Sequence, residues 1–140
     1  MFEQQTGNGV NMDDSGSLVN PSTNIAIIHC IFRDIKATGN NDLLKLSGLD
    51  FFSISECTFL NGSLGSSGSG IDMVGCHNGR INKCTFENMG ANSIQMKGGS
   101  QYIRIAKHFL KKVGNEQSIL AEVPGWHFLD LRMQHLRLQI

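Results

Sequence analysis

The chain has no net charge, few aromatic residues and no long apolar run. Its 140 residues carry 12 basic and 12 acidic side chains, so electrostatics does not direct it toward nucleic acid or a membrane surface. No apolar stretch approaches the roughly 20 residues of a transmembrane helix. Residues 1–9 also lack the basic start and apolar stretch of a secretory signal. We therefore expect neither nucleic acid nor a membrane among its partners.

The scarcity of aromatic residues also restricts the fold. Aromatic residues make up only 7% of the chain, whereas 16 residues are glycine, and Asn and Ser are frequent. This composition favours short strands joined by tight turns and disfavours a helical bundle. A chain of this length forms one domain at most.

What the chain does contain is two interleaved repeats. In the first, an Ile stands three residues before a Cys and a Phe two residues after it. In the second, an apolar residue and a Met or Leu enclose one other residue. The first repeat recurs at one constant interval at Ile27, Cys30, Phe32; Ile54, Cys57, Phe59; and Ile81, Cys84, Phe86, and then after a slightly shorter interval at Ile105, His108, Leu110. The second occurs at residues 10–12, 44–46, 71–73 and 94–96.

Two repeats on one period indicate a solenoid whose coils stack strand on strand. The second repeat alternates with a period of two, as do the triplets Ile25-Ala26-Ile27, Phe52-Ser53-Ile54 and Ile103-Arg104-Ile105 that end at the Ile of the first. In each triplet the outer residues face the interior and the middle residue faces solvent. We expect one interior ladder of Phe32, Phe59, Phe86 and Leu110, and another of Leu46, Met73 and Met96. The predicted fold is all-β: a right-handed parallel β-helix of about four coils.

The repeat also resembles a known family. Residues 81–90 read Ile-x-x-Cys-Thr-Phe-x-Asn-x-Gly, which is similar to the right-handed parallel β-helix repeats of the pectate-lyase-like superfamily. The resemblance covers roughly residues 8–114. It implies a fold common in secreted bacterial proteins that bind, cleave or epimerise acidic polysaccharides, and thus an exported or cell-surface parent protein. It does not imply activity, because the repeat is structural.

The residue types at the cysteine position of the repeat suggest a zinc site, but the spacing of stacked coils argues against one. Three Cys and His108 share one repeat position, and thiolates with an imidazole are common zinc ligands. Donors stacked at about 4.8 Å intervals would span roughly 14 Å over four coils, too far to surround one ion. We therefore predict no metal site and a ladder of buried thiols instead.

Candidate site residues come from the outward-facing middle positions. One outward row reads Asn11, Lys45, Asp72, Gln95, and the next reads Asp13, Ser47, Val74, Lys97. We take Lys45, Asp72 and Gln95, with Arg104 of the other repeat, as candidate substrate-binding residues. The alternative is a cross-coil ion pair on a solvated sheet, worth roughly 0.2–1 kcal/mol.

Lys97 is the candidate catalytic residue. Its context, Met96-Lys97-Gly98-Gly99, loosely resembles the catalytic Lys region of chondroitinase-B-like and alginate-lyase-like β-helix enzymes. In such enzymes the resemblance implies a Lys or Arg base, a partner Arg one coil further on, and often Ca²⁺ held by Asp. Residues 115–125 contain no Arg. Without that partner the match to a lyase is incomplete. We expect no cofactor, and Ca²⁺ is possible only if the chain is a lyase.

The repeat pattern ends abruptly near Gly114, which divides the chain into coils over 1–114 and an atypical segment over 115–140. Glycine becomes rare and leucine frequent, and Ser118 stands where the next strand is due. Residues 128–140 can form a helix with one apolar face that caps the solenoid. The account that we prefer to a native cap is a lost base near Gly114, since another frame can restore the strand motif. Because Val10 already lies halfway through a coil, we expect a fragment of a longer solenoid.

Three function classes follow. The preferred one is a carbohydrate-associated scaffold that binds a polysaccharide. The second is part of a polysaccharide lyase or epimerase acting on uronic-acid polymers. The third is a purely structural or adhesin-type solenoid, which needs no site.

Overall fold

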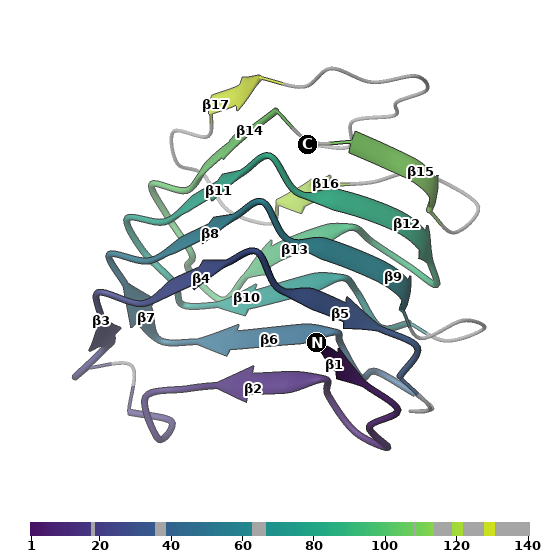
Figure 1. Cartoon of the computed structure of the whole chain (residues 1–140). Coiled ribbons are helices and arrows are strands. Elements are labelled where there is room, and N and C mark those ends of the chain that lie inside the picture. The colour runs from purple at the N-terminus through teal and green to yellow at the C-terminus, as the bar shows by residue number, and fades with distance from the viewer. Residues whose placement is uncertain are drawn as a thin grey trace.

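The computed structural model describes residues 1–17, 19–35, 39–62, 67–107, 109–113, 119–121 and 128–130. Within these ranges the chain is all-β, and its strands form a parallel β-solenoid of about four turns (Figure 1). Over the same ranges no helix has the length and hydropathy needed to cross a membrane. The all-β solenoid predicted from the repeats is confirmed.

Three parallel sheets form the walls of the solenoid. Sheet 1 contains β2 (Val10–Met12), β6 (Leu44–Ser47), β10 (Ile71–Val74), β13 (Ile94–Lys97) and β16 (Ile119–Ala121). Sheet 2 contains β4 (Ala26–Ile28), β8 (Ser53–Ser55), β11 (Arg80–Asn82), β14 (Arg104–Ala106) and β17 (Phe128–Asp130). Sheet 3 contains β1 (Phe2–Glu3), β5 (Ile31–Arg33), β9 (Thr58–Gly62), β12 (Thr85–Met89) and β15 (Phe109–Val113). A short pair, β3 (Ser22–Thr23) with β7 (Leu49–Asp50), joins sheets 1 and 2.

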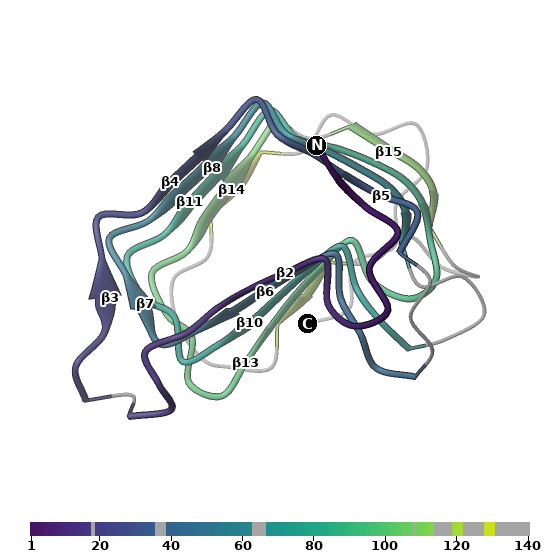
Figure 2. The same cartoon turned by 60° about the horizontal axis from the view of Figure 1, so that its bottom comes forward.

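The coil is right-handed. Figure 2 views the solenoid from its N-terminal coil, and there the chain runs clockwise from β2 through β4 to β5 while later coils recede. This is the hand expected for parallel strands joined by crossover connections.

The phenylalanine ladder is present as predicted. Phe32 pairs with Phe59, Phe59 with Phe86, and Phe86 with Leu110. Ring centroids are 4.9 and 4.8 Å apart along the Phe32–Phe59–Phe86 stack, and the rings are almost parallel. Phe2 adds a rung that the repeat did not show, stacked 5.0 Å from Phe32. The stack fills the solenoid beside sheet 3 because every second residue of those strands faces inward.

The other interior ladders also follow the alternation. Leu46, Met73 and Met96 are in register in sheet 1 and are fully buried. In sheet 2 the isoleucine of each copy of the first repeat occupies the equivalent inward position and is buried. Stacking identical rows lets short strands build one continuous apolar core.

Residues after 114 depart from the prediction in two places. The strand due near Ser118 is β16, where Ile119 pairs with Ile94 in the register of sheet 1. At 128–130 the apolar spacing allowed a helix, but the structure has strand β17, with Leu129 paired to Ile105. By pairing in parallel with β14, strand β17 satisfies the backbone N–H and C=O groups at the edge of sheet 2. A helix at 128–130 would leave those groups unpaired. The rest of the expected helix lies outside the described residues, and the boundary at 114 stays a prediction.

The coils turn corners at residues in the left-handed backbone region. One corner row, between sheets 1 and 2, has φ of 59°, 51°, 50° and 58° at Asn24, Phe51, Asn78 and Tyr102. A second, between sheets 2 and 3, has φ of 54°, 55°, 52° and 58° at His29, Glu56, Lys83 and Lys107. Because every coil uses the same two bends, side chains at equivalent corner positions lie one above another along the solenoid.

Candidate functional site

The outward row of sheet 1 is aligned as the repeat predicts. Asn11 pairs with Lys45, Lys45 with Asp72, and Asp72 with Gln95. In the next row Val74 lies between Ser47 and Lys97. The parallel register therefore brings residues from four coils onto one strip of surface.

Asp72 does not face solvent as we expected. Its side chain is fully buried, although it lies on the outward side of β10. Two lysines cover it: Lys45 donates to Asp72 Oδ2 from the preceding coil, and Lys97 Nζ lies 3.1 Å from the same oxygen from the following coil. The ammonium groups compensate the buried carboxylate, which would otherwise be strongly destabilising.

The other oxygen of this carboxylate is unpaired. Asp72 Oδ1 is buried and has no hydrogen-bond partner among the described residues. A buried carboxylate oxygen without a donor is costly, and native proteins retain few such groups. The strip therefore contains an unsatisfied acceptor beneath two cations.

Asp42 is a fourth charged member that the sequence analysis missed. Its carboxylate is buried; Oδ1 accepts a 2.6 Å hydrogen bond from the Ser69 amide, and Oδ2 lies 3.8 Å from Lys45 Nζ. Burial raises the pKa of Asp42, although the Ser69 amide and Lys45 oppose this change. A signal was available, because a polar residue stands two positions before each copy of the second repeat: Asn8, Asp42, Ser69 and Asn92.

The environment of Lys45 differs from that of an ordinary surface lysine. Its side chain is 20% exposed, and burial lowers its pKa; the neighbouring Lys97 ammonium lowers it further, while Asp42 raises it. Lys97 is 25% exposed and held against Asp72. The pKa of Lys45 therefore moves in the direction that a general base needs.

The remaining members of the strip are polar. Ser69 Oγ donates to Gln95 Oε1 at 3.5 Å, so the Gln95 amide is oriented by the preceding coil. Asn11 Nδ2 donates to Asp13 Oδ2 at 2.8 Å, and Asp13 Oδ1 accepts from the Ser15 amide. Hydrogen bonds within the chain thus hold both ends of the strip.

Arg104 is not part of this strip. It begins β14 in sheet 2, where it pairs with Arg80, whereas Lys45, Asp72 and Gln95 belong to sheet 1. The repeat pattern alone groups it with them, because Arg104 is also the middle residue of an apolar triplet, Ile103-Arg104-Ile105. The structure therefore brings together Lys45, Asp72, Gln95 and Lys97 and leaves Arg104 on another wall.

Of the repeat cysteines, Cys57 and Cys84 are buried, whereas Cys30 in the first coil is half-exposed. Cys57 Sγ donates to the Ser55 and Ile27 carbonyls at 3.3 and 3.5 Å, and Cys84 Sγ donates to the Asn82 carbonyl at 3.4 Å. All four cysteines are free thiols. His108, the fourth member of the row, lies outside the described residues.

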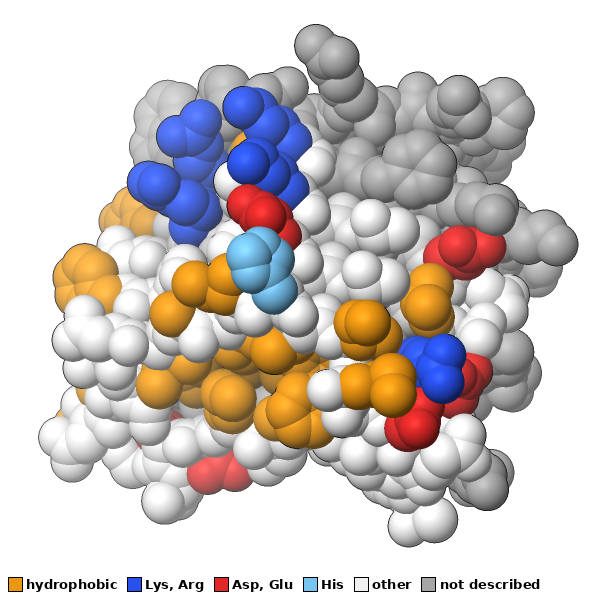
Figure 3. Space-filling view, in the orientation of Figure 1, with side chains coloured by type: hydrophobic (Ala, Val, Ile, Leu, Met, Phe, Trp, Pro, Cys, Tyr) orange, Lys and Arg blue, Asp and Glu red, His pale blue; other side chains and the backbone are white. Residues whose placement is uncertain are grey.

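An apolar hollow opens beside the N-terminal coil. Its volume is about 370 Å³, and Figure 3 shows hydrophobic side chains gathered between β2 and β4. The lining consists of Phe2, Val10, Met12, Ala26, Ile27, Ile28, Cys30 and Phe32. With no charged side chain in that lining, the hollow selects no particular chemistry, and the polar strip is the stronger candidate site.

Comparison with known proteins does not add a family. No protein family, curated protein or solved structure matched the chain. The parallel β-solenoid is established by the strand pairing of the chain itself.

Proposed function

We propose that this solenoid binds a polysaccharide along the outward face of sheet 1. The observation that carries the proposal is the convergence of Lys45 and Lys97 on one oxygen of the buried Asp72. The carboxylate fixes the position of two ammonium groups from separate coils, and binding groups fixed in advance lose less entropy when a ligand arrives.

The fixed ammonium groups retain donors for a ligand. Each lysine has three N–H donors, and both side chains are 20–25% exposed. Sugar hydroxyl or carboxylate oxygens can accept these hydrogen bonds, and the oriented Gln95 amide extends the strip by one coil. A polymer of polar rings lying across successive coils fits this row of donors and acceptors.

The resemblance of the repeat to the pectate-lyase-like superfamily supports the same ligand class. Members of that superfamily bind or cleave acidic polysaccharides, and we extend this association to the chain as part of the proposal. We take its parent protein to be exported or cell-surface for the same reason.

Affinity electrophoresis tests the proposal. The wild-type chain should be retarded in gels that contain alginate or polygalacturonate and less so with neutral dextran. Lys97→Ser introduces the residue found at the equivalent position of β6 and leaves Asp72 paired to Lys45. Loss of a hydrogen bond from a charged group costs about 1.5–3 kcal/mol, so we expect roughly a tenfold or greater loss of affinity.

Arg33→Gln is the control. Arg33 is on sheet 3 and pairs with Glu3, whereas the strip belongs to sheet 1. It should leave retardation unchanged. Equal affinities of wild type and Lys97→Ser, or no retardation of the wild type by any acidic polymer, would reject the proposal.

Eliminative cleavage is the second candidate function, favoured by the lowered pKa of Lys45. In this reaction the neutral Lys45 amine would remove the C5 proton next to a uronate carboxylate. The C4–O glycosidic bond would break as the C4–C5 double bond forms, and the leaving oxygen would take a proton from water. Ultraviolet absorbance should then rise on incubation with alginate, faster at higher pH as Lys45 loses its proton. Unchanged absorbance with every uronate polymer would reject cleavage and leave binding as the only proposed function.

A further inference from the structure

The corner before sheet 2 alternates asparagine with an exposed aromatic residue. Thr23 pairs with Asp50, Asp50 bridges to His77, and His77 bridges to Gln101. The residues that follow these four are therefore equivalent in successive coils: Asn24, Phe51, Asn78 and Tyr102. Asparagine tolerates this left-handed bend well, and it is present in coils one and three.

The aromatic residues at this corner are costly to the fold. Phe51 and Tyr102 adopt φ of 51° and 58°, a region that bulky side chains rarely occupy, and they are 60% and 56% exposed. Neither side chain offsets this cost by burying its ring in the core, because both rings are mostly exposed. Unfavourable backbone conformations of this kind cluster at binding sites.

The repeat sets the distance between the two aromatic positions. They lie two coils apart, and with the spacing of 4.8–4.9 Å seen in the phenylalanine ladder their separation along the solenoid is about 9.6 Å. Asn78 occupies the coil between them, where its Nδ2 donates to Asp50 Oδ1 at 2.8 Å. The corner is thus a short track with an apolar ring at each end and a positioned amide at its centre.

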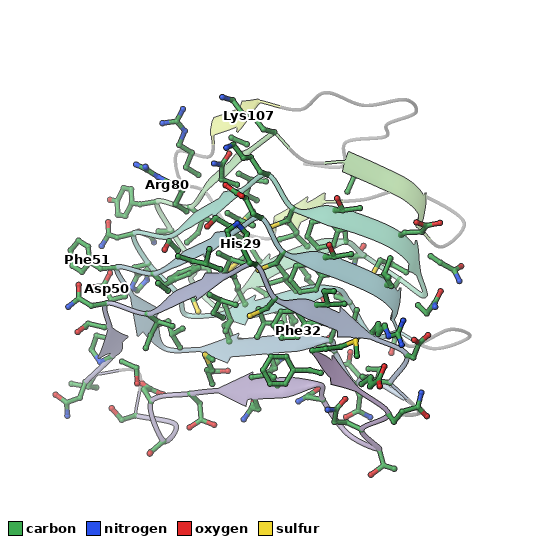
Figure 4. The ribbon with its side chains drawn as sticks, viewed as in Figure 1. His29, Phe32, Asp50, Phe51, Arg80 and Lys107 are labelled. Atoms are coloured by element: carbon green, nitrogen blue, oxygen red, sulfur yellow. The ribbon has the colours of Figure 1, made fainter. Side chains whose placement is uncertain are left out.

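Cations border this track on the outward face of sheet 2. Arg80 and Arg104 are both exposed and directly paired in register, so two cations stand on adjacent strands of one face. Lys83 and Lys107 continue the positive charge at the next corner, where Glu56 already accepts from Lys83 and His29. Figure 3 shows this basic patch over the upper coils. In Figure 4, Phe51 and Arg80 project from the same side.

We propose that this surface, made by Phe51, Asn78, Tyr102, Arg80 and Arg104, binds an acidic glycan chain that lies parallel to the solenoid axis. Sugar rings have an apolar face that stacks on the two aromatic rings, hydroxyl groups that reach Asn78, and acidic substituents that meet the arginines. Arginine binds carboxylate and tetrahedral oxyanions through paired N–H donors, so uronate and sulfate-ester glycans share the required chemistry.

The charge distribution favours a glycan over single-stranded nucleic acid. Nucleic-acid sites combine stacking with an extended basic groove that follows many phosphates. Here the chain has no net charge, and Glu56 interrupts the positive row one coil below Lys83. A sparse distribution of acidic groups on the ligand fits such a short patch.

The inference does not depend on the strip of sheet 1. The two surfaces lie on different walls of the solenoid and share no residue, so the two tests can fail independently. Lys97→Ser should leave binding at this corner unchanged, and corner variants should leave the sheet 1 strip intact.

The repeat itself supplies variants that keep the fold. Phe51→Asn with Tyr102→Asn introduces the residue of coils one and three and relieves the strained bends, so thermal stability should be maintained or increased. Arg80→Ser with Arg104→Ser introduces the residue of β8 at the paired position. All are made in the Lys97→Ser background, which weakens the strip of sheet 1, and Arg33→Gln in that background is the matched control.

Binding is measured by titration calorimetry of the whole chain with alginate, dextran sulfate, neutral dextran and single-stranded DNA. We expect binding of at least one acidic glycan, about tenfold weaker in the aromatic double variant. The arginine double variant should also bind more weakly and lose most of its salt dependence. Comparing alginate with dextran sulfate distinguishes carboxylate from sulfate-ester ligands.

Three results would overturn the inference. One is that the aromatic double variant, folded by circular dichroism, binds the acidic glycans as tightly as its Lys97→Ser parent. Another is tighter binding of DNA than of either acidic glycan, which would assign the surface to nucleic acid. The third is absence of binding to both acidic glycans in the Lys97→Ser background, or an equal loss of affinity in the Arg33→Gln control.

Discussion

Replacing Phe59 by alanine should remove the central rung of the aromatic ladder and strongly destabilise the solenoid. The Phe59 ring is fully buried and stacks on both sides, 4.9 Å from Phe32 and 4.8 Å from Phe86. A buried Phe→Ala change costs about 3–5 kcal/mol, and stacked pairs are worth about 0.5–1.5 kcal/mol beyond burial. Because the overall Phe→Ala range already includes lost contacts, two lost stacked pairs place the expected cost in its upper half, about 4–5 kcal/mol.

Urea denaturation followed by circular dichroism measures this cost. Phe2→Ala is the matched control, because Phe2 is 38% exposed and stacks on one side only; its burial and single pair correspond to about 1–2 kcal/mol. Phe59→Leu should fall between wild type and Phe59→Ala, since leucine occupies the same ladder position as Leu110. Equal losses for Phe59→Ala and Phe2→Ala, or a Phe59→Ala loss below about 1 kcal/mol, would refute the ladder as a source of stability.

Three further predictions concern the charged and thiol groups. Asp72→Ala leaves two lysines facing each other without their carboxylate and should lower the free energy of unfolding by about 1–3 kcal/mol in urea titrations; an unchanged midpoint would contradict the burial of that charge. Hydrogen bonds from His29 and Lys83 lower the pKa of Glu56, so its contribution to stability is present above the ordinary glutamate pKa and is lost as the pH falls through the lowered one. Glu56→Gln should therefore flatten the acid side of a plot of Tm against pH, and two superimposable profiles would disprove this. Burial raises the pKa of Cys76, so a thiol reagent should modify the half-exposed Cys30 well before Cys76 in the native protein; simultaneous reaction would show that the interior is open.

Local pattern was sufficient for most of the fold. Strand alternation and the constant period of the first repeat predicted the strands of sheets 1 and 2, and the ladder from Phe32 to Leu110 was predicted residue by residue. The strand at Ile119 was missed because it begins one position after Ser118, where the repeat placed its start. Turn lengths vary between coils, so register is set by pairing with the neighbouring strand and not by counting.

The candidate site was predicted only in part, for a related reason. The row from Asn11 to Gln95 followed from alternation, but alternation assigns a side of the sheet and not a degree of burial. Asp72 is outward and yet buried, because lysines from the two adjacent coils close over it. Asp42 joins the cluster from a position outside the strand, where period-two alternation says nothing.

By itself, the sequence determined that this chain is a solenoid, because a repeating apolar pattern is stored in the order of residues and each coil needs only its neighbours to bury it. Only the tertiary structure decided which wall each outward residue occupies. It separated Arg104 from Lys45, placed Lys97 on Asp72, and aligned Phe51 with Tyr102 across an intervening coil. Those relations depend on where the chain bends between strands, and the bends bring together residues that no fixed spacing in the sequence connects.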